Sequence, residues 1–307
     1  MKKIITILLC IFLFTGCLNT VKNQGEIKIN NVINETIETL QTPEIRETPT
    51  ESSLSYTILN KEESTIEGRY SPPEGFTRIE VAEDSFGKFL RNQKLKPYGE
   101  KSLYYDGRSK YSEGVYDSVI DVDIGTRDLH QCADAIMLLR AEYLYGHERF
   151  DQIKFNFVGG FLAEYQKWVD GYRIQVDGND AKWIALAEYS TSYESFRKYM
   201  DMVFAYSGTL SLEKELTPVG IEDMEIGDVF IRGGSPGHAI IVVDMAQNSL
   251  TGEKVFMLAQ SYMPAQQTQI LINKNNEIIS PWYLIDTEAE LLTPEWKFKQ
   301  TELKRFL

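Results

Sequence analysis

The sequence is poor in several kinds of residue, and each shortage excludes a class of structure or function. Among 307 residues there are three cysteines and three histidines, and the formal net charge is −13. Binding to nucleic acid without sequence preference needs basic patches against phosphate, so this deficit of positive charge excludes it. Gly233 and Gly234 open onto an apolar strand pattern and not onto a helix, so they do not form a phosphate-binding loop. We therefore expect no nucleic-acid partner and no cofactor.

The N-terminus has an apolar run that is too short to cross a bilayer. Residues 4–14 follow Lys2 and Lys3, whereas a spanning helix needs about 20 apolar residues. The run ends in "FTGC", which resembles the lipobox of bacterial lipoproteins. That resemblance implies that Cys17 receives diacylglycerol and becomes the mature N-terminus. The protein would then be exported and anchored by lipid in the cell envelope, either on the periplasmic side or at the cell surface. An ordinary secretory signal with an incidental cysteine is the alternative.

The cysteine count leaves one thiol for the mature chain. Cys10 would leave with the signal peptide (residues 1–17) and Cys17 would carry the lipid, so Cys132 remains alone. An exported chain with one thiol cannot form an internal disulfide. A free thiol outside the cytoplasm is exposed to oxidation unless it is buried or used. Cys132 is therefore either a core residue or a functional one.

Composition divides the mature chain into two parts. Residues 18–66 are rich in Thr, Glu and Asn and contain few aromatic residues, so they cannot bury enough apolar surface to offset the entropy of ordering. We interpret them as a flexible stalk. Aromatic residues are frequent from 67 to 307, where no internal repeat is found, and this part is expected to be a single α+β domain and a monomer.

The helix with the strongest sequence signals carries Cys132. The stretch "DLHQCADAIMLLRAEYLYG" has Asp128 as a candidate N-cap with Gln131 three residues later, and Gly146 suits its end. A second capped helix is predicted over 191–208, beginning at Thr191. Cys132 is thus expected in the first turn of a helix that faces the core.

Several strands are also predicted. A hairpin over 168–186 would turn near Gly178 and Asn179. Three short strands, "IGDVFI", "GHAIIVV" and "EKVFMLAQS", should form an antiparallel sheet, and the second reads as buried on both faces. In "VIDVDI", Asp121 and Asp123 would lie on the outer face of a half-buried strand, either as a solvated surface or as metal ligands.

This order of elements predicts a reactive thiol. A cysteine pKa of about 8.5 falls at a helix N-terminus or beside an imidazolium, and the thiolate is the nucleophile. His238 lies at the start of the buried strand, after "GGSPG", where it can face Cys132. Gln260, near the end of the following strand, is the candidate that orients the imidazole ring. We expect a Cys132 thiolate held by His238.

The same order resembles the NlpC-type and CHAP-type papain-like peptidases, which cleave peptide or amide bonds of bacterial cell walls. The resemblance implies a papain-like fold in which a cysteine-bearing helix packs on an antiparallel sheet. It further implies Cys132 as nucleophile, His238 as base and Gln260 as its orienter, with Asp228 structural. This chain departs from the pattern in two ways: it has Gln-Cys-Ala-Asp where the family has Asp-Cys-Ser-Gly, and 106 residues separate Cys132 from His238.

Longer motifs resemble a second family. The stretches "QCADAIMLLRAEYLY", "GDVFIRGGSPGHAIIVVDMA" and "LAQSYMPAQ" are similar to the bacterial family called domain of unknown function 4846. The likeness extends from about residue 70 to the end of the chain. It implies an exported and often lipid-anchored protein and gives no substrate.

Each candidate residue also has a purely structural interpretation. Cys132 can pack as a small hydrophobe, His238 can bond a nearby carbonyl, and Gln260 can satisfy a strand end. Tyr262 and Gln266 in "AQSYMPAQQTQ" either line a cleft as substrate-binding residues or belong to core and surface. His130 and Cys132 make a His-x-Cys pair, but too few further ligands are evident for zinc, and no metal site is expected.

The leading hypothesis is an exported, lipid-anchored cysteine hydrolase that attacks an amide or peptide bond, with cell-wall peptide as substrate. The competing hypothesis is a lipoprotein without catalysis that binds a wall fragment or a protein partner in the same cleft. A cleft beside a paired sulfur and imidazole would favour the enzyme.

Overall fold

The computed structural model describes residues 57–111 and 114–307. The predicted signal peptide, Cys17 and most of the predicted stalk lie outside the described residues. The packed part begins before residue 67, because Leu59 pairs with Tyr70 and Ile66 is fully buried. No helix within the described ranges is long and apolar enough to cross a membrane.

The centre of the molecule is a nine-stranded sheet whose strand pairs are all antiparallel. Its main path runs β2-β11-β10-β9-β8-β15-β7, while β1 pairs with β9 and β12 with β10. The strands are β1 (Phe76–Arg78), β2 (Tyr116–Val119), β7 (Thr217–Pro218), β8 (Val229–Arg232), β9 (His238–Asn248), β10 (Lys254–Gln260), β11 (Gln269–Leu271), β12 (Tyr283–Leu284) and β15 (Leu303–Arg305).

The central strand is the one that begins at His238. In β9 every residue from His238 to Ala246 is buried. Alternate side chains enter two hydrophobic clusters: Ile241 and Val243 face the helices, whereas Ile240 and Val242 face the C-terminal segment. The predicted burial of this strand on both faces is confirmed.

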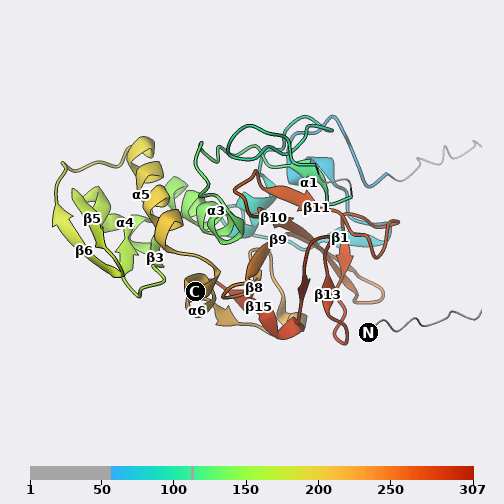
Figure 1. Ribbon diagram of the computed structural model, residues 1–307. Helices are drawn as coiled ribbons and strands as arrows, with labels where there is room; N and C mark the ends of the chain where they lie inside the picture. Colours follow the sequence, from blue (N-terminus) through green and yellow to red (C-terminus); the bar gives the residue numbers. More distant parts are fainter. Residues whose placement is uncertain (1–56, 112–113) are drawn as a thin grey trace, which may run out of the picture. The chain divides into compact units, whose positions relative to one another are not determined.

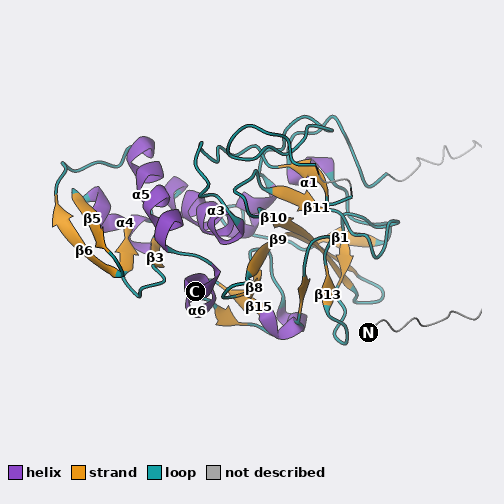
Figure 2. Cartoon of the chain, viewed as in Figure 1, coloured by secondary structure: helices purple, strands orange, loops and turns teal. Residues whose placement is uncertain are grey.

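Helices cover one face of the sheet (Figure 2). The helix α3 (Cys132–Gly146) packs on β9 and β10 beside α2 (Phe86–Arg91). It is buried around most of its circumference, because Ala133, Ala135, Met137 and Leu138 are as inaccessible as Ile136. The helix predicted to face the core is therefore buried on more than one side. A short helix, α1 (Ile66–Arg69), precedes α2.

The chain between α3 and β8 forms a lobe that extends away from the sheet (Figure 1). It contains β3 (Lys154–Asn156), β4 (Leu162–Glu164), α4 (Tyr165–Val169), β5 (Tyr172–Asp177), β6 (Asp180–Ala185) and α5 (Tyr193–Tyr206), and α6 (Thr209–Glu215) leads back to the sheet. The predicted hairpin is confirmed as β5 and β6, with Gly178 and Asn179 between them. In the lobe, Phe196 of α5 contacts Tyr165 of α4 and also Tyr145, which belongs to α3.

Two boundaries differ from the prediction. The helix α5 is capped by Ser192, whose hydroxyl accepts the Ser195 N–H at 3.2 Å, and not by Thr191. The strand predicted over "VIDVDI" ends at Val119, so Asp121 and Asp123 lie in the exposed segment that follows. The remaining elements are a small hairpin of β13 (Leu291–Leu292) and β14 (Lys297–Phe298), and three 3₁₀ turns, Phe150–Gln152, Ile221–Asp223 and Gln300–Glu302.

Candidate active site

Cys132 is the first residue of α3, with Gln131 as its N-cap. The Gln131 N–H donates to Asp134 Oδ2 at 3.0 Å, which closes the first turn. Asp128, the predicted cap, lies farther back and accepts the Ala265 N–H at 2.6 Å and the Gln131 side-chain amide at 3.1 Å. The cysteine therefore lies at the very start of the helix, where unpaired backbone N–H groups favour negative charge.

His238 lies at the start of β9, where the preceding glycine allows a tight approach. A Cβ on Gly237 would lie 2.5 Å from the Gly234 carbonyl oxygen and 2.8 Å from that of Arg232. The His238 side chain is 1% exposed, and its Nε2 lies 2.9 Å from Gln260 Oε1. Trp296 and Tyr262 contact the ring, with centroids 5.3 and 4.7 Å away.

The protonation of the His238 ring follows from the next contact. Gln260 Nε2 donates to Glu295 Oε2 at 2.6 Å, so the Gln260 oxygen must face the histidine. An oxygen acceptor requires a proton on His238 Nε2. The neutral ring therefore carries its lone pair on Nδ1, where it can act as a base.

Cys132 and His238 line one pocket of about 410 Å³. Tyr262 and Trp296 form an aromatic wall, and the loop that precedes His238 forms another side. Gln260 is 1% exposed and lies behind the histidine, outside the pocket. The sequence-predicted trio thus consists of two residues at a cleft and one behind them.

The surroundings of Cys132 disfavour the predicted thiolate. Burial, and then the Asp134 carboxylate, raise the pKa of the Cys132 thiol to about 11, although a hydrogen bond from the Ala239 backbone N–H acts in the opposite direction. Burial likewise lowers the pKa of His238 to about 4. No hydrogen bond joins the sulfur to the imidazole among the contacts of residues 57–111 and 114–307. These shifts favour a neutral thiol and a neutral imidazole at neutral pH, in residues that line the same pocket.

The two predicted substrate-binding residues have different positions. Tyr262 is partly exposed and lines the pocket. Gln266 is 1% exposed and does not line it, because its amide accepts from Gln269 at 2.8 Å and donates to the Pro264 carbonyl. Gln266 thus supports the loop and does not contact a ligand in this pocket.

The other histidine near the cysteine points away from the cleft. His130 is 1% exposed, with Nε2 3.1 Å from the Thr268 hydroxyl, and burial lowers its pKa to about 3. Its Nδ1 is buried without a partner. Across the described part of the chain, no group of three or more His, Cys, Asp or Glu side chains is placed to hold a metal ion, and Asp121 and Asp123 are no exception.

Several residues around the histidine were not predicted from the sequence. Trp296 packs on the His238 ring, Glu295 bonds Gln260, and Lys110 pairs with Glu295 at 2.9 Å. A Lys and a Glu 185 residues apart read as ordinary surface charges. The one available hint is that Glu295 and Trp296 stand together in "TPEWKF", a short segment between turn signals.

The long interval between Cys132 and His238 is accounted for by the lobe. The chain leaves α3 at Gly146 and returns to the sheet through α6, whose N-cap Gly208 and first residue Thr209 line the pocket. Phe204, near the end of α5, also lines it. The lobe therefore supplies one wall of the cleft.

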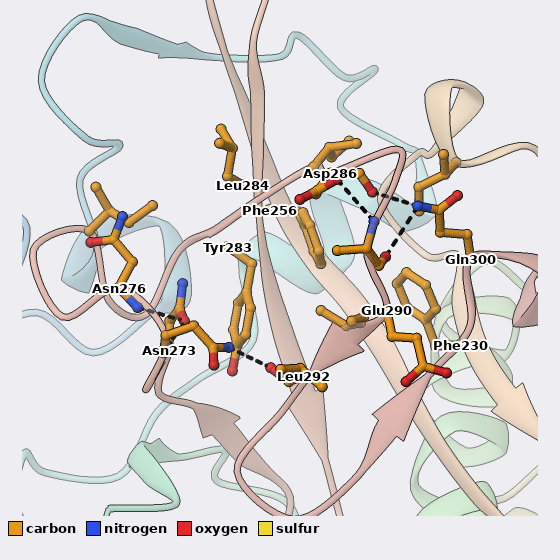
Figure 3. A pocket seen from close by; sticks show the side chains of 16 residues that line it. Phe230, Phe256, Asn273, Asn276, Tyr283, Leu284, Asp286, Glu290, Leu292 and Gln300 are labelled. Atoms are coloured by element: carbon orange, nitrogen blue, oxygen red, sulfur yellow. Dashed lines mark hydrogen bonds between the residues drawn. The ribbon is translucent and has the colours of Figure 1, made fainter.

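A second pocket, of about 290 Å³, has a different character (Figure 3). Its floor is apolar, with Phe230, Phe256 and Tyr283. The side-chain amide of Gln300 in this pocket bonds to the neighbouring loop. Its Nε2 donates to the Asp286 and Ala289 carbonyls, as Figure 3 shows. No cysteine or histidine lines it, so Cys132 and His238 line only the first of these two pockets.

The chain was compared with protein families, curated proteins and solved structures. Neither the curated proteins nor the solved structures include a significant match to this chain. The family model described as "Domain of unknown function (4846)" matches residues 66–305, which span the whole sheet and the candidate site. The chain belongs to this family, domain of unknown function 4846.

Proposed function

We propose that this protein is a cysteine hydrolase of papain-like design that cleaves an amide or peptide bond. One observation carries the proposal. A helix-start cysteine and a histidine line the same pocket, and the histidine is bonded through Nε2 to a glutamine whose orientation is fixed. A nucleophile, a base and its orienter are the minimum set for acyl transfer.

In the proposed reaction His238 acts as a general base. As the substrate carbonyl enters, Nδ1 takes the thiol proton while the Cys132 sulfur bonds the carbonyl carbon. Backbone N–H groups at the start of α3 stabilise the resulting oxyanion. His238 then gives the proton to the amine nitrogen, the C–N bond breaks, and a thioester remains. Water, deprotonated by His238, hydrolyses the thioester and restores the thiol.

This mechanism needs no thiolate in the free enzyme. A histidine with its pKa near 4 is neutral at physiological pH and is ready to accept a proton. A sulfur without a hydrogen bond to the ring needs a substrate-induced rotation, and catalytic contacts often shorten only in the substrate complex. The barrier is lowered by proton transfer during attack.

The proposed location of the protein suggests its substrate. The apolar run that ends at Cys17 is the basis for proposing export and a lipid anchor in the cell envelope. Peptide or amide bonds of the cell wall are the abundant substrates there. We therefore propose cell-wall peptide as the substrate.

The second candidate is a binding lipoprotein that uses the same cleft without catalysis. The raised pKa of Cys132 and the absence of a hydrogen bond to His238 in the described structure favour it. Such a protein would retain its ligand affinity when the thiol is removed.

Incubation with purified cell-wall fragments, followed by mass analysis of the products, separates the two candidates. We expect new fragments with the native protein and none with Cys132→Ala or His238→Gln. His147→Gln is the matched control, because His147 is exposed and does not line the pocket. Unchanged fragments that co-purify with both the native protein and Cys132→Ala would establish the binding function and reject the hydrolase.

A further inference from the structure

An ion pair between a buried lysine and a partly exposed glutamate lies behind the histidine and its glutamine. Lys110 Nζ lies 2.9 Å from Glu295 Oε2, and only 4% of the lysine side chain and 24% of the glutamate side chain are exposed. Nζ also lies 3.4 Å from Gln269 Oε1. The lysine is therefore held from two sides.

An ion pair in this position is costly for stability alone. Removing charges from water is costly, and their mutual attraction often does no more than offset that cost. Burial lowers the pKa of Lys110, although Glu295 opposes the shift. A pair that adds little stability can instead fix the position of its neighbours.

The hydrogen bonds show what this pair fixes. Lys110 Nζ and Gln260 Nε2 both bond the same oxygen, Glu295 Oε2. The lysine sets the position of that oxygen, and the oxygen sets which end of the Gln260 amide faces His238. We propose that Glu295, held by Lys110, is the positioning residue that selects the Nε2-protonated form of His238 through Gln260.

The four residues come from separate parts of the fold. Lys110 lies in the loop before β2, His238 begins β9, Gln260 ends β10, and Glu295 lies between β13 and β14. The arrangement therefore does not serve to stabilise one helix or strand. The proposal rests on the proposed function only for what the positioned ring is used for. The hydrogen bonds that position the ring do not depend on a substrate.

Other ionisable groups around His238 are accounted for. Cys132 shares its pocket and Tyr262 contacts its ring. Arg232, its cross-strand partner in β8, is paired with Glu302 at 2.6 Å and lies over Trp296. Glu295 and Lys110 are the charges whose removal should change the titration of His238, and in opposite directions.

The test is ¹⁵N NMR of histidine-labelled full-length protein, which reports ring tautomer and pKa directly. With three histidines in the chain, His130→Gln and His147→Gln assign the remaining signals. Glu295→Gln keeps an oxygen acceptor and removes the charge, Glu295→Leu removes both, and Lys110→Met removes the opposing charge. Glu67→Gln is the matched control, because Glu67 pairs with Lys88 at 3.0 Å and is one-third exposed.

The native protein should show His238 protonated on Nε2 at neutral pH. Glu295→Gln should keep this tautomer and lower the pKa of His238 by about one unit, whereas Lys110→Met should raise it by about as much. Glu295→Leu should leave a mixture with roughly half of each tautomer, because the Gln260 amide is free to turn. The control should change neither quantity. Opposite pKa shifts would not follow from a general loss of packing.

The proposal is overturned if the His238 tautomer is unchanged in Glu295→Leu, or if Glu295→Gln and Lys110→Met shift the pKa in the same direction. If Glu295→Leu fails to fold, the pair of opposite shifts still decides. The outcome is separable from that of the proposed function: a protein that hydrolyses nothing can still give these shifts, and an active hydrolase can fail to give them.

Discussion

The reactivity of Cys132 should rise steeply with pH and show no plateau near neutrality. With a pKa of about 11, roughly one molecule in 10⁴ carries the thiolate at pH 7, compared with about 3% for a free thiol of pKa about 8.5. Alkylation by iodoacetamide should therefore be about 300-fold slower than in the unfolded chain. The rate should climb about tenfold per pH unit between pH 7 and 10.

The assay is alkylation under pseudo-first-order conditions, with the modified fraction read by intact mass. Cys132→Ala gives the background from any other site, and the urea-unfolded protein gives the free-thiol reference. A midpoint below about 8.5, or rates still high at pH 6, would show that His238 holds a thiolate. Such a result would refute the argument from burial and restore the ion pair expected from the sequence.

Three further outcomes are expected. Burial lowers the pKa of His130 to about 3 and that of His238 to about 4, from 6.5 in the unfolded chain. The stability that the two buried neutral rings contribute is therefore present above pH 6.5 and is lost as the pH falls toward 4. His130→Gln should thus reduce the slope of the unfolding free energy in this window by up to about 1.4 kcal/mol per pH unit, and an unchanged slope in urea titrations would contradict it. No lysine or arginine lines the pocket while Asp128 does, so a cationic methanethiosulfonate should modify Cys132 faster than an anionic one. Asp128→Asn should reduce the ratio of the cationic to the anionic modification rate. Equal rates for the two reagents in the native protein would contradict this prediction. Cys17→Ala should move the protein to the aqueous phase of a detergent partition, whereas retention in the detergent phase would argue against lipid at this position.

The local patterns predicted much of the sheet. The strand from His238 was predicted because apolar residues without a break, bounded by glycines, suit burial on both faces. The hairpin of β5 and β6 was predicted because Gly178 and Asn179 fit a two-residue turn. Both patterns are contained within a few residues.

The N-cap and the first residue of α3 could not be predicted from the sequence. The stretch "DLHQCAD" offers Asp128 as a candidate cap, but the backbone N–H of Ala265 donates to Asp128, and Gln131 is the N-cap. That bond joins residues 137 positions apart. The environment of the thiol was missed for the same reason, because burial by β9 opposes the effect of the helix N-terminus.

The candidate site was predictable in part. Cys132, His238 and Gln260 could be proposed because cysteine, histidine and glutamine stood at element ends in a known order. Glu295 and Lys110 could not, because charged residues are usually solvated and only the fold brings these two together behind Gln260. The lobe was read as part of one continuous domain because its composition matches the rest of the chain.

The central claim is that Cys132 forms a covalent bond to an acyl group. Its most direct test is the intact mass of the protein after brief mixing with cell-wall peptide fragments and an acid quench, followed by peptide mapping of residues 128–146. The account predicts an added acyl mass on Cys132 in the native protein, accumulation of product amine, and neither in Cys132→Ala. Release of product by Cys132→Ala at the native rate, or no adduct and no product with any fragment that binds the pocket, would contradict it.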